Sequence, residues 1–363
     1  MSAAGNPSPQ PSPRERGEGA RKGGEAPILR IGIAGLGRMG RHHAENLARH
    51  VPGAELVAAC SPLVEELEWA GSALGVTRRF ADYGAMLASG DIDAVWLVTP
   101  TTLHAQQIVD ALQAGKHVFS EKPLSLDLGE CERVEGEATK YPGLKVMIGF
   151  VRRFDSDYQA AHARIKRGEI GRPFMVRSHT LDKNDPSGFF VRFAETSGGM
   201  FLDMSVHDID CARWLLGAAE PKRVFAIGTV AVHEGLRQWR DVDNGMALCE
   251  FADGGIAYFG ASRTTAHGFE AQTEIIGTGG RLTVSAVPRV DDIVIADAHG
   301  VRSESPPTFY ERFADAFLRE ARAFVDCVRK NRAPPLTLRD ATEATRIGIA
   351  LRESLLTGRA VEL

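Results

Sequence analysis

The chain has 363 residues, 44% hydrophobic and 25% charged, with a formal net charge of -4 at pH 7. This is the composition of an ordinary globular protein that is long enough for two domains. The charge and the lack of a long apolar run give no reason to expect a nucleic-acid partner or a membrane span, and five scattered cysteines without a C-x-x-C pair predict reduced thiols and a cytoplasmic location.

The first 27 residues differ from the rest of the chain, because they are rich in Pro, Gly, Ser, Arg and Glu. Such a segment cannot offset the entropy that is lost on ordering it, so residues 1–27 are predicted to be a disordered tail. They lack the apolar core of a secretory signal. A start codon placed too far upstream is an alternative explanation for this segment.

The first predicted strand, residues 28–34, leads into a glycine-rich loop and then a helix over 41–49. The loop reads Gly35-Leu36-Gly37-Arg38-Met39-Gly40. In this context the first glycine permits a tight turn, the second lets the backbone approach a pyrophosphate, and the third lets helix and strand pack closely. With a second strand over 54–60, the pattern predicts a Rossmann domain that binds a dinucleotide.

The residue after the second strand bears on the choice of cofactor, because an acid there commonly holds the ribose hydroxyls of NAD. Ser61 occupies this position, so the sugar contact must be weaker or made differently. An NADP site would need a basic residue, for which Arg38 or the more distant Arg78 and Arg79 are the candidates, with three glutamates between Ser61 and Arg78. We therefore expect NAD, with NADP as the alternative.

Two further loops follow predicted strands, over 94–98 and 117–119. Loops at the carboxyl edge of a parallel sheet face the crevice in which the cofactor lies. The side chains expected to contact the cofactor from these loops are Thr99, Pro100, His104, Glu121 and Lys122. A lysine at this edge can also bind a substrate oxygen or perturb the pKa of a neighbour.

Asp203 and His207 stand four residues apart, shortly after Gly198-Gly199. In a helix this spacing puts both side chains on one face, where the carboxylate could orient the imidazole. Such a pair also occurs by chance as a solvated ion pair or a structural histidine, so its meaning depends on the rest of the chain. Asp208 and Asp210 fall on other helix faces and no His-rich cluster completes a ligand set, so no metal site is predicted.

The second half of the chain alternates polar and apolar residues in several segments, which predicts half-buried strands of a mostly antiparallel sheet. These strands are expected over 174–178, 224–232, 246–251, 256–262 and 274–276. Hairpin turns are expected at Gly254-Gly255 and over 277–280. Helices are expected over 310–330 and 340–356, the latter capped by Asp340. One sheet face would cover the substrate and the other is free to pack on a second subunit, so we expect a homo-oligomer, a dimer or tetramer.

Five motifs follow one another along the chain: GLGRMG, VTPTTLHA, AGKHVFSEKP, GFVRRFD and GGMFLDMSVHDID. In this order and at these separations they resemble the glucose-fructose oxidoreductase, inositol dehydrogenase and MocA family, over nearly the whole chain from Ile28. Within that family the second domain looks most like the inositol 2-dehydrogenases. The resemblance implies a Rossmann domain over 28–150 and, over 151–363, an α+β domain with a large, mostly antiparallel open sheet.

The resemblance also implies that Lys122, Asp203 and His207 are the catalytic residues, and that they contact the substrate. His207 would remove the hydroxyl proton, Asp203 would orient His207, and Lys122 would stabilise alkoxide character while the nicotinamide takes the hydride. The side chains expected at the remaining substrate hydroxyls are Arg153, Asp155, Asn184 and His267.

The expected activity is therefore NAD(P)-dependent oxidation of a secondary alcohol of a cyclic polyol or sugar, with myo-inositol to 2-keto-inositol as the first choice. Two departures leave the polyol open, because the histidine expected beside Asn184 is missing and His267 stands where a tyrosine is expected. Three alternatives remain: a dehydrogenase of another sugar, a dinucleotide-binding regulatory protein of the same fold, and an enzyme in which a bound, recycled NAD assists elimination at a sugar carbon.

Overall fold

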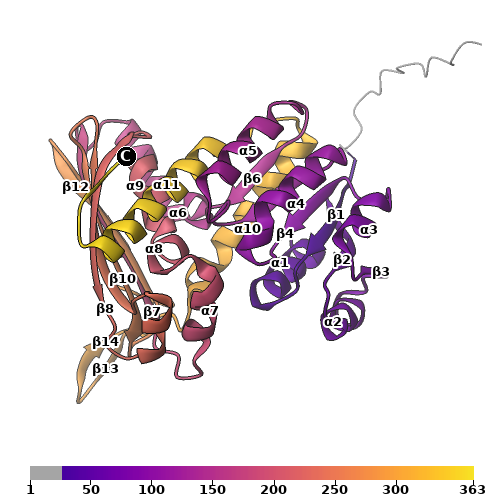
Figure 1. Cartoon of the computed structure of the whole chain (residues 1–363). Helices are drawn as coiled ribbons and strands as arrows, with labels where there is room; N and C mark the ends of the chain where they lie inside the picture. The colour runs from indigo at the N-terminus through magenta and orange to yellow at the C-terminus, as the bar shows by residue number, and fades with distance from the viewer. Residues whose placement is uncertain (1–26) are drawn as a thin grey trace, which may run out of the picture.

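The computed structural model describes residues 27–363, which form two sheets with helices packed between and around them (Figure 1). The tail predicted over 1–27 lies, apart from Pro27, outside the described residues. No helix in the described part is long and apolar enough to cross a membrane.

The first sheet has six parallel strands in the order β3-β2-β1-β4-β5-β6. Its strands are β1 Leu29–Ala34, β2 Ala54–Cys60, β3 Arg78–Phe80, β4 Ala94–Leu97, β5 His117–Glu121 and β6 Val146–Gly149. The central strands are short, apolar and buried on both faces, as parallel strands are when helices cover both sides. The strand order reverses between β1 and β4, and ligands of open α/β sheets bind at such a switch point.

Helices from both ends of the chain cover this sheet. The connecting helices are α1 Arg38–Arg49, α2 Val64–Leu74, α3 Tyr83–Ala88, α4 Thr101–Gln113 and α5 Leu128–Ala138. Helix α10, Phe309–Arg329, comes late in the sequence but also packs here. Its Phe324 meets the stacked rings of Trp96 and Phe119 edge-on, with centroids 5.6 and 6.0 Å away. The division into domains over 28–150 and 151–363 remains our prediction, and α10 ties the two parts together.

The second sheet has seven strands in the order β12-β11-β7-β10-β9-β8-β15, all antiparallel neighbours except β7 and β10. They are β7 Pro173–Lys183, β8 Pro221–Thr229, β9 Asn244–Phe251, β10 Ile256–Thr265, β11 Glu270–Gly277, β12 Gly280–Val284 and β15 Val361–Glu362. A separate hairpin pairs β13, Ile295–Asp297, with β14, Gly300–Arg302. The predicted fold class is confirmed, and so are the hairpin turns after β9 and β11.

Helices cover one face of the second sheet and leave the other face bare (Figure 1). The elements on the covered side are η1 Val151–Phe154, α6 Ser156–Lys166, α7 Phe189–Ser197, α8 Met200–Asp203, α9 Val206–Leu215, η2 Glu234–Trp239 and α11 Leu338–Thr357. Strand β9 shows the alternation that produces this arrangement. Ala247, Cys249 and Phe251 are buried under the helices, whereas Met246 and Leu248 are 57% and 56% exposed on the bare face.

Helix α11 corrects one detail of the sequence prediction. Its N-cap is Thr337, whose hydroxyl accepts a hydrogen bond from the Asp340 main-chain N–H at 3.1 Å. Asp340 accepts a bond from the Thr337 N–H in return, at 2.9 Å. The expectation that Asp340 is the cap is therefore wrong, because it is the partner three residues into the helix in a capping box.

Candidate active site

A cleft of about 360 Å³ lies between the carboxyl ends of the first sheet and the helices of the second part. The residues that reach it from the first sheet are Arg38, Met39, Val98, Thr99, Pro100, Thr101, His104, Glu121, Lys122 and Pro123. The other side is formed largely by aromatic rings, namely Phe189, Phe190, Phe193, Phe269, Phe309, Phe313 and Phe317. The cleft thus combines an apolar wall with a few polar groups, as small-molecule sites do.

The glycine loop at one end of the cleft has the geometry that a pyrophosphate needs. Gly35 has φ of 88°, and a Cβ there would overlap the Val98 carbonyl oxygen. A Cβ on Gly40 would overlap the Gly35 carbonyl oxygen, so both positions require glycine for space. Gly37 is the N-cap of α1 and offers no side-chain cap, which leaves the first N–H groups of the helix free for a phosphate. These residues fit a dinucleotide.

Arg38 extends from this loop toward the second part of the chain. Its guanidinium lies over the ring of Phe189 at 5.0 Å and over those of Phe309 and Tyr310 at 5.6 Å. Stacking of this kind holds a cation against aromatic faces. Arg38 therefore links the glycine loop to α7 and α10, and its charge is directed away from the end of β2.

The predicted loops after β4 and β5 meet at His104. Its Nδ1 lies 2.8 Å from the Pro123 carbonyl oxygen and its Nε2 lies 2.9 Å from the Thr99 carbonyl oxygen. Burial lowers the pKa of His104. His104 thus holds the two loops together at the floor of the cleft, where Pro100 is the N-cap of α4.

Glu121 ends β5 with its carboxylate turned toward α1. Its Oε1 lies 2.7 Å from Nε2 of the buried His43, and its Oε2 accepts a bond from the Lys122 N–H at 3.2 Å. These bonds fix the main chain at the point where Lys122 leaves the sheet and enters the cleft.

The Lys122 side chain reaches across the cleft to Asp203. Its Nζ donates to the Asp203 carbonyl oxygen at 2.6 Å and lies 3.3 Å from Asp203 Oδ1. The buried Arg263 donates to Asp203 Oδ2 at 2.8 Å. Burial by itself would raise the pKa of Asp203, but Lys122 and Arg263 hold that pKa below its ordinary value. The carboxylate is therefore ionised and positions the ammonium group.

His207 lines the same cleft but does not share a helix with Asp203. Helix α8 ends at Asp203 and α9 begins at Val206, so the expectation of one continuous helix face is wrong. In the described part of the chain the Asp203 carboxylate is bound by Lys122 and Arg263, and none of its hydrogen bonds goes to His207. The four-residue spacing could not reveal this interruption.

The His207 imidazole lies in the wall of the cleft. Its Nδ1 is enclosed and has no hydrogen-bond partner among the described residues, and the Phe150 ring stands perpendicular to it at 6.2 Å. Burial lowers the pKa of His207 well below its ordinary value, and the charges of Lys122 and Arg152 lower it further. The ring is therefore neutral near pH 7 and can accept a proton.

Two of the expected substrate ligands point elsewhere. Arg153 is buried and bonds both oxygens of Asp210, at 2.6 and 2.8 Å. Asp155 caps α6 and pairs with Arg312 at 2.8 Å. Both have structural roles away from the cleft, which corrects the expectation. The physical reason is that Arg153 lies in a 3₁₀ turn, which Asp155 directly follows. Successive side chains of such a turn diverge by a third of a turn, so that Arg152 faces the cleft instead.

The other two expected ligands lie beyond the strand ends. The Asn184 main-chain N–H donates to the Thr265 carbonyl oxygen at 2.9 Å, and its side chain is exposed. His267 is also exposed and its Nε2 lies 3.1 Å from Glu270 Oε2. Neither residue lines the cleft as the structure describes it.

Sequence reasoning did not assign a role to Asp182 or Arg263, although strand alternation contains the signal. In β7, Ser178, Thr180 and Asp182 face inward together, and Thr180 and Asp182 line the cleft. Burial and the neighbouring Asp203 raise the pKa of Asp182 to about 6. A carboxyl group of this kind in a cleft is a candidate ligand for a polar substrate.

Asp208 and Asp210, which raised the question of a metal, are both committed to arginines. Asp208 Oδ1 accepts from Arg152 at 2.6 Å, and Asp210 Oδ1 accepts from Arg153 at 2.6 Å. Both carboxylates are buried, and each stabilises a buried guanidinium. In the residues that the structure describes, no group of three or more His, Cys, Asp or Glu side chains is placed to hold a metal ion.

Two family models match the chain. The model of the oxidoreductase family with an NAD-binding Rossmann fold matches residues 29–150, and that of the GFO/IDH/MocA C-terminal domain matches residues 158–283. The first sheet is thus an NAD-binding Rossmann domain, as predicted.

Individual relatives span almost the whole chain. The scyllo-inositol 2-dehydrogenase (NAD(+)) of Bacillus subtilis is 38% identical over 92% of this chain and 96% of its own. The myo-inositol 2-dehydrogenase of Thermotoga maritima is 34% identical over 92% and 98%. The crystal structure of scyllo-inositol dehydrogenase from Lactobacillus casei with NAD(H) and scyllo-inositol matches with a TM-score of 0.89, at 40% identity over 92% of this chain and 99% of that one. The chain therefore belongs to the GFO/IDH/MocA family of oxidoreductases, which confirms the resemblance drawn from its motifs.

Proposed function

We propose that this chain is an NAD-dependent dehydrogenase that oxidises a ring hydroxyl of an inositol, like the inositol 2-dehydrogenases among its relatives. The observation that carries the proposal is that Lys122 and His207 line one cleft with Arg38 and Met39 of the glycine loop. Oxidation of an alcohol needs a base for the hydroxyl proton and a cation for the developing alkoxide. The cleft offers both beside the dinucleotide site.

Each catalytic residue has a distinct task in this proposal. When bound, NAD supplies the acceptor for the hydride that leaves the alcohol carbon. His207 takes the hydroxyl proton at Nε2, because its Nδ1 is enclosed by protein. Lys122 has three N–H donors, of which Asp203 engages two, so one remains for the reacting oxygen. Asp203 acts as the residue that positions Lys122, with Arg263 holding its other oxygen.

Asp182 is our candidate for a second polar contact to the substrate. It lines the cleft, and no described residue bonds its carboxyl group. A carboxylate can accept hydrogen bonds from two neighbouring hydroxyls of a ring, which gives orientation as well as affinity. We propose that Asp182 takes the place of the histidine that the resemblance led us to expect.

Two inositol isomers are the first substrates to test. The sequence favoured myo-inositol. However, two relatives named for scyllo-inositol are 38% and 40% identical to this chain, against 34% for the Thermotoga maritima relative named for myo-inositol. The two isomers differ in configuration at one carbon, so oxidation at that carbon gives the same ketone. We propose that scyllo-inositol has the higher kcat/KM.

The test follows the absorbance of reduced cofactor after NAD is added to purified enzyme with scyllo-inositol, myo-inositol or glucose. We expect reduction with at least one inositol at a kcat/KM at least tenfold above that for glucose. The variant His207→Ala serves as the inactive control. A preference for glucose would support a sugar dehydrogenase, and no reduction with any of the three would leave a dinucleotide-binding regulatory protein as the better reading.

A bound NAD that is recycled during elimination would leave a different signature. Product would then form without net reduction of added NAD, which analysis of the reaction mixture by mass spectrometry detects as loss of water from the substrate. We expect a mass loss of two hydrogens instead. Loss of water without net cofactor reduction would contradict the dehydrogenase proposal.

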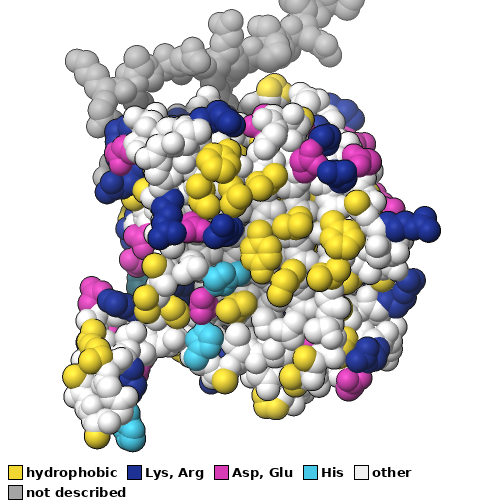
Figure 2. Space-filling model, turned by 90° about the vertical axis from the view of Figure 1, so that its left-hand side faces the viewer, with side chains coloured by type: hydrophobic (Ala, Val, Ile, Leu, Met, Phe, Trp, Pro, Cys, Tyr) yellow, Lys and Arg dark blue, Asp and Glu magenta, His cyan; other side chains and the backbone are white. Residues whose placement is uncertain are grey.

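We also propose that the bare face of the second sheet binds a second copy of the chain. Hydrophobic side chains gather in the middle of this face, with charged groups toward its rim (Figure 2). Phe225, Ile227, Met246, Leu248 and Ile256 come from three adjacent strands and are 37% to 57% exposed. An exposed apolar patch on an open sheet is typical of a subunit interface, and a second copy of the chain offers a matching apolar surface.

Light scattering after size exclusion tests this face. We expect a dimer or tetramer for the wild type and monomers for the double variant Met246→Glu, Leu248→Glu. A wild-type monomer would contradict the proposal. For the location in the cell we propose the cytoplasm, which is supported by five cysteines that are all buried and unpaired.

A further inference from the structure

A carboxylate lies at the end of β2, although the residue at that position of the sequence is not acidic. Ser61 stands where an acid is expected, and its hydroxyl donates to Glu66 Oε2 at 2.5 Å. The same hydroxyl accepts a bond from the Leu63 main-chain N–H at 3.1 Å, which fixes its direction. Glu66 lies in the first turn of α2, so its side chain is drawn back toward the end of β2.

The second oxygen of Glu66 faces the glycine loop. Its Oε1 lies 4.0 Å from the position that a Cβ on Gly37 would take, and it is the one atom that such a Cβ would approach so closely. No hydrogen bond to this oxygen is made by the residues that the structure describes. An acceptor therefore stands beside the loop that fits the pyrophosphate.

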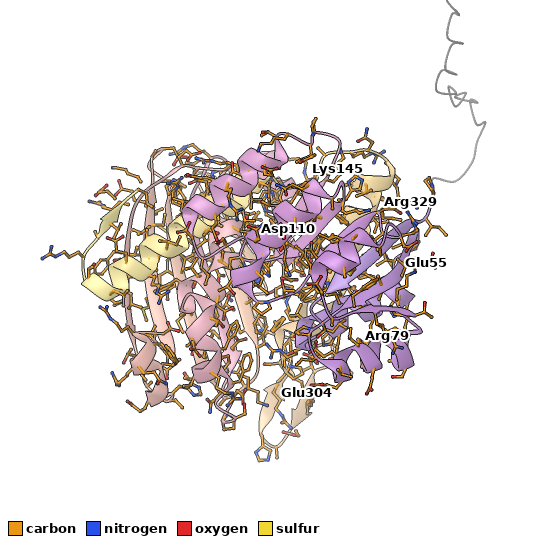
Figure 3. All side chains as sticks on the ribbon, turned by 45° about the vertical axis from the view of Figure 1, so that its right-hand side comes forward. Glu55, Arg79, Asp110, Lys145, Glu304 and Arg329 are labelled. Carbon is orange, nitrogen blue, oxygen red and sulfur yellow. The ribbon has the colours of Figure 1, made fainter. Side chains whose placement is uncertain are left out.

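The cations nearby are engaged elsewhere. Arg41 donates to the Leu36 carbonyl oxygen at 3.3 Å and lies over the Trp69 ring at 4.9 Å. Arg78 forms an ion pair with Asp91. Arg79 donates to the Leu67 carbonyl oxygen at 3.5 Å and lies at the outer rim of the first sheet (Figure 3). Arg78 and Arg79, the two arginines considered for a 2'-phosphate after β2, thus have partners other than Glu66.

We propose that Glu66, held by Ser61, binds the 2'- and 3'-hydroxyls of the adenosine ribose and excludes NADP. A carboxylate accepts from both hydroxyls of a ribose, whereas it repels the 2'-phosphate of NADP. The serine thus replaces the missing acid indirectly, by positioning a glutamate from the next helix. This inference rests on dinucleotide binding at the glycine loop, which is part of the proposed function, but not on the identity of the polyol.

The test measures binding of NADH and NADPH without any polyol, from the change in nicotinamide fluorescence. We expect the wild type to bind NADH at least 100-fold more tightly than NADPH. Glu66→Gln keeps the size of the side chain and removes the charge, so its affinity for NADH should fall by about 10-fold, the value of a hydrogen bond to a charged group. Its preference for NADH over NADPH should narrow by at least 10-fold.

Two further variants separate the role of Glu66 from general effects on α2. Ser61→Ala removes the hydrogen bond that holds Glu66. We expect it to lower the NADH affinity, and the preference for NADH over NADPH, by less than Glu66→Gln does. Glu68→Gln removes a charge from the exposed face of the same helix and should leave both affinities within twofold of the wild type.

Equal wild-type affinity for NADH and NADPH would overturn the proposal. The proposal would also be overturned if Glu66→Gln kept a preference for NADH over NADPH within twofold of that of the wild type. Because no polyol is present, a chain that failed to oxidise any inositol could still show the expected pattern, so the two proposals fail independently.

Discussion

Lys122 and Asp203 are joined by two contacts from a single ammonium group, one to the main-chain oxygen of Asp203 and one to its side chain. The two contacts together hold the ammonium group in one position. Because the two residues come from the two halves of the chain, this pair also fixes the position of the second part against the first sheet.

Removal of the Lys122 ammonium should abolish most turnover. We expect Lys122→Met to lower kcat/KM for inositol by about 10² to 10³, the effect of removing one donor to a developing alkoxide. NADH affinity should stay within threefold, which fluorescence titration checks. Lys166→Met, at an exposed position in α6, is the matched control. Turnover of Lys122→Met within tenfold of wild type would contradict the assigned role.

The pH profile of oxidation should report the low pKa of His207. A base must be neutral to accept a proton, so its contribution is lost as pH falls through its pKa. Since burial holds that pKa well below 6.5, kcat/KM should show no loss attributable to His207 between pH 8 and 6.5. His207→Gln should lower kcat/KM by about 10² to 10⁴ throughout this range. A His207-dependent loss centred at pH 6.5 or above would contradict this assignment.

Much of this site follows from local sterics, and that part could be predicted from the sequence. The glycines of the loop are required by contacts within a few residues or across adjacent strands, as at Gly35 and Gly40. The position of Lys122 follows in the same way, because it directly follows the short strand β5.

The rest of the site depends on contacts that the spacing of residues along the sequence does not reveal. The break between α8 and α9 separates Asp203 from His207, and one partner of the Asp203 carboxylate is Arg263, sixty residues further on. The Arg152-Arg153 pair shows the same limit, because only the 3₁₀ turn decides which guanidinium faces the cleft. The motif identified the segment, but the structure places Arg152 at the cleft and Arg153 away from it.

Arg153 should matter for stability and not for chemistry. Its guanidinium bonds both oxygens of the buried Asp210, so Arg153→Met leaves a buried carboxylate unpaired. Loss of one partner of a buried ion pair costs about 3–5 kcal/mol. We expect the midpoint of urea unfolding to fall while the KM for inositol of the folded enzyme stays within threefold. A large rise in KM with unchanged stability would restore Arg153 as a substrate ligand.

Asp182 should make stability depend on pH in a defined direction. Its pKa of about 6 in the folded chain exceeds the ordinary value of 3.8, so the folded state binds the extra proton. The stability that this proton contributes is present below pH 4 and is lost as pH rises through 6. At pH 8 the ionised carboxylate lowers the free energy of unfolding, and Asp182→Asn removes this destabilisation.

We therefore expect Asp182→Asn to raise the free energy of unfolding by about 1–3 kcal/mol at pH 8, since each pKa unit corresponds to about 1.4 kcal/mol. The gain should shrink at pH 5, where the wild type is itself largely protonated at this site. Thermal unfolding at the two pH values measures the difference, and the KM for inositol should rise at pH 8 because the acceptor for ring hydroxyls is weakened. An equal change in stability at both pH values would show that the raised pKa of Asp182 is not the cause, and an unchanged KM would remove Asp182 from the substrate site.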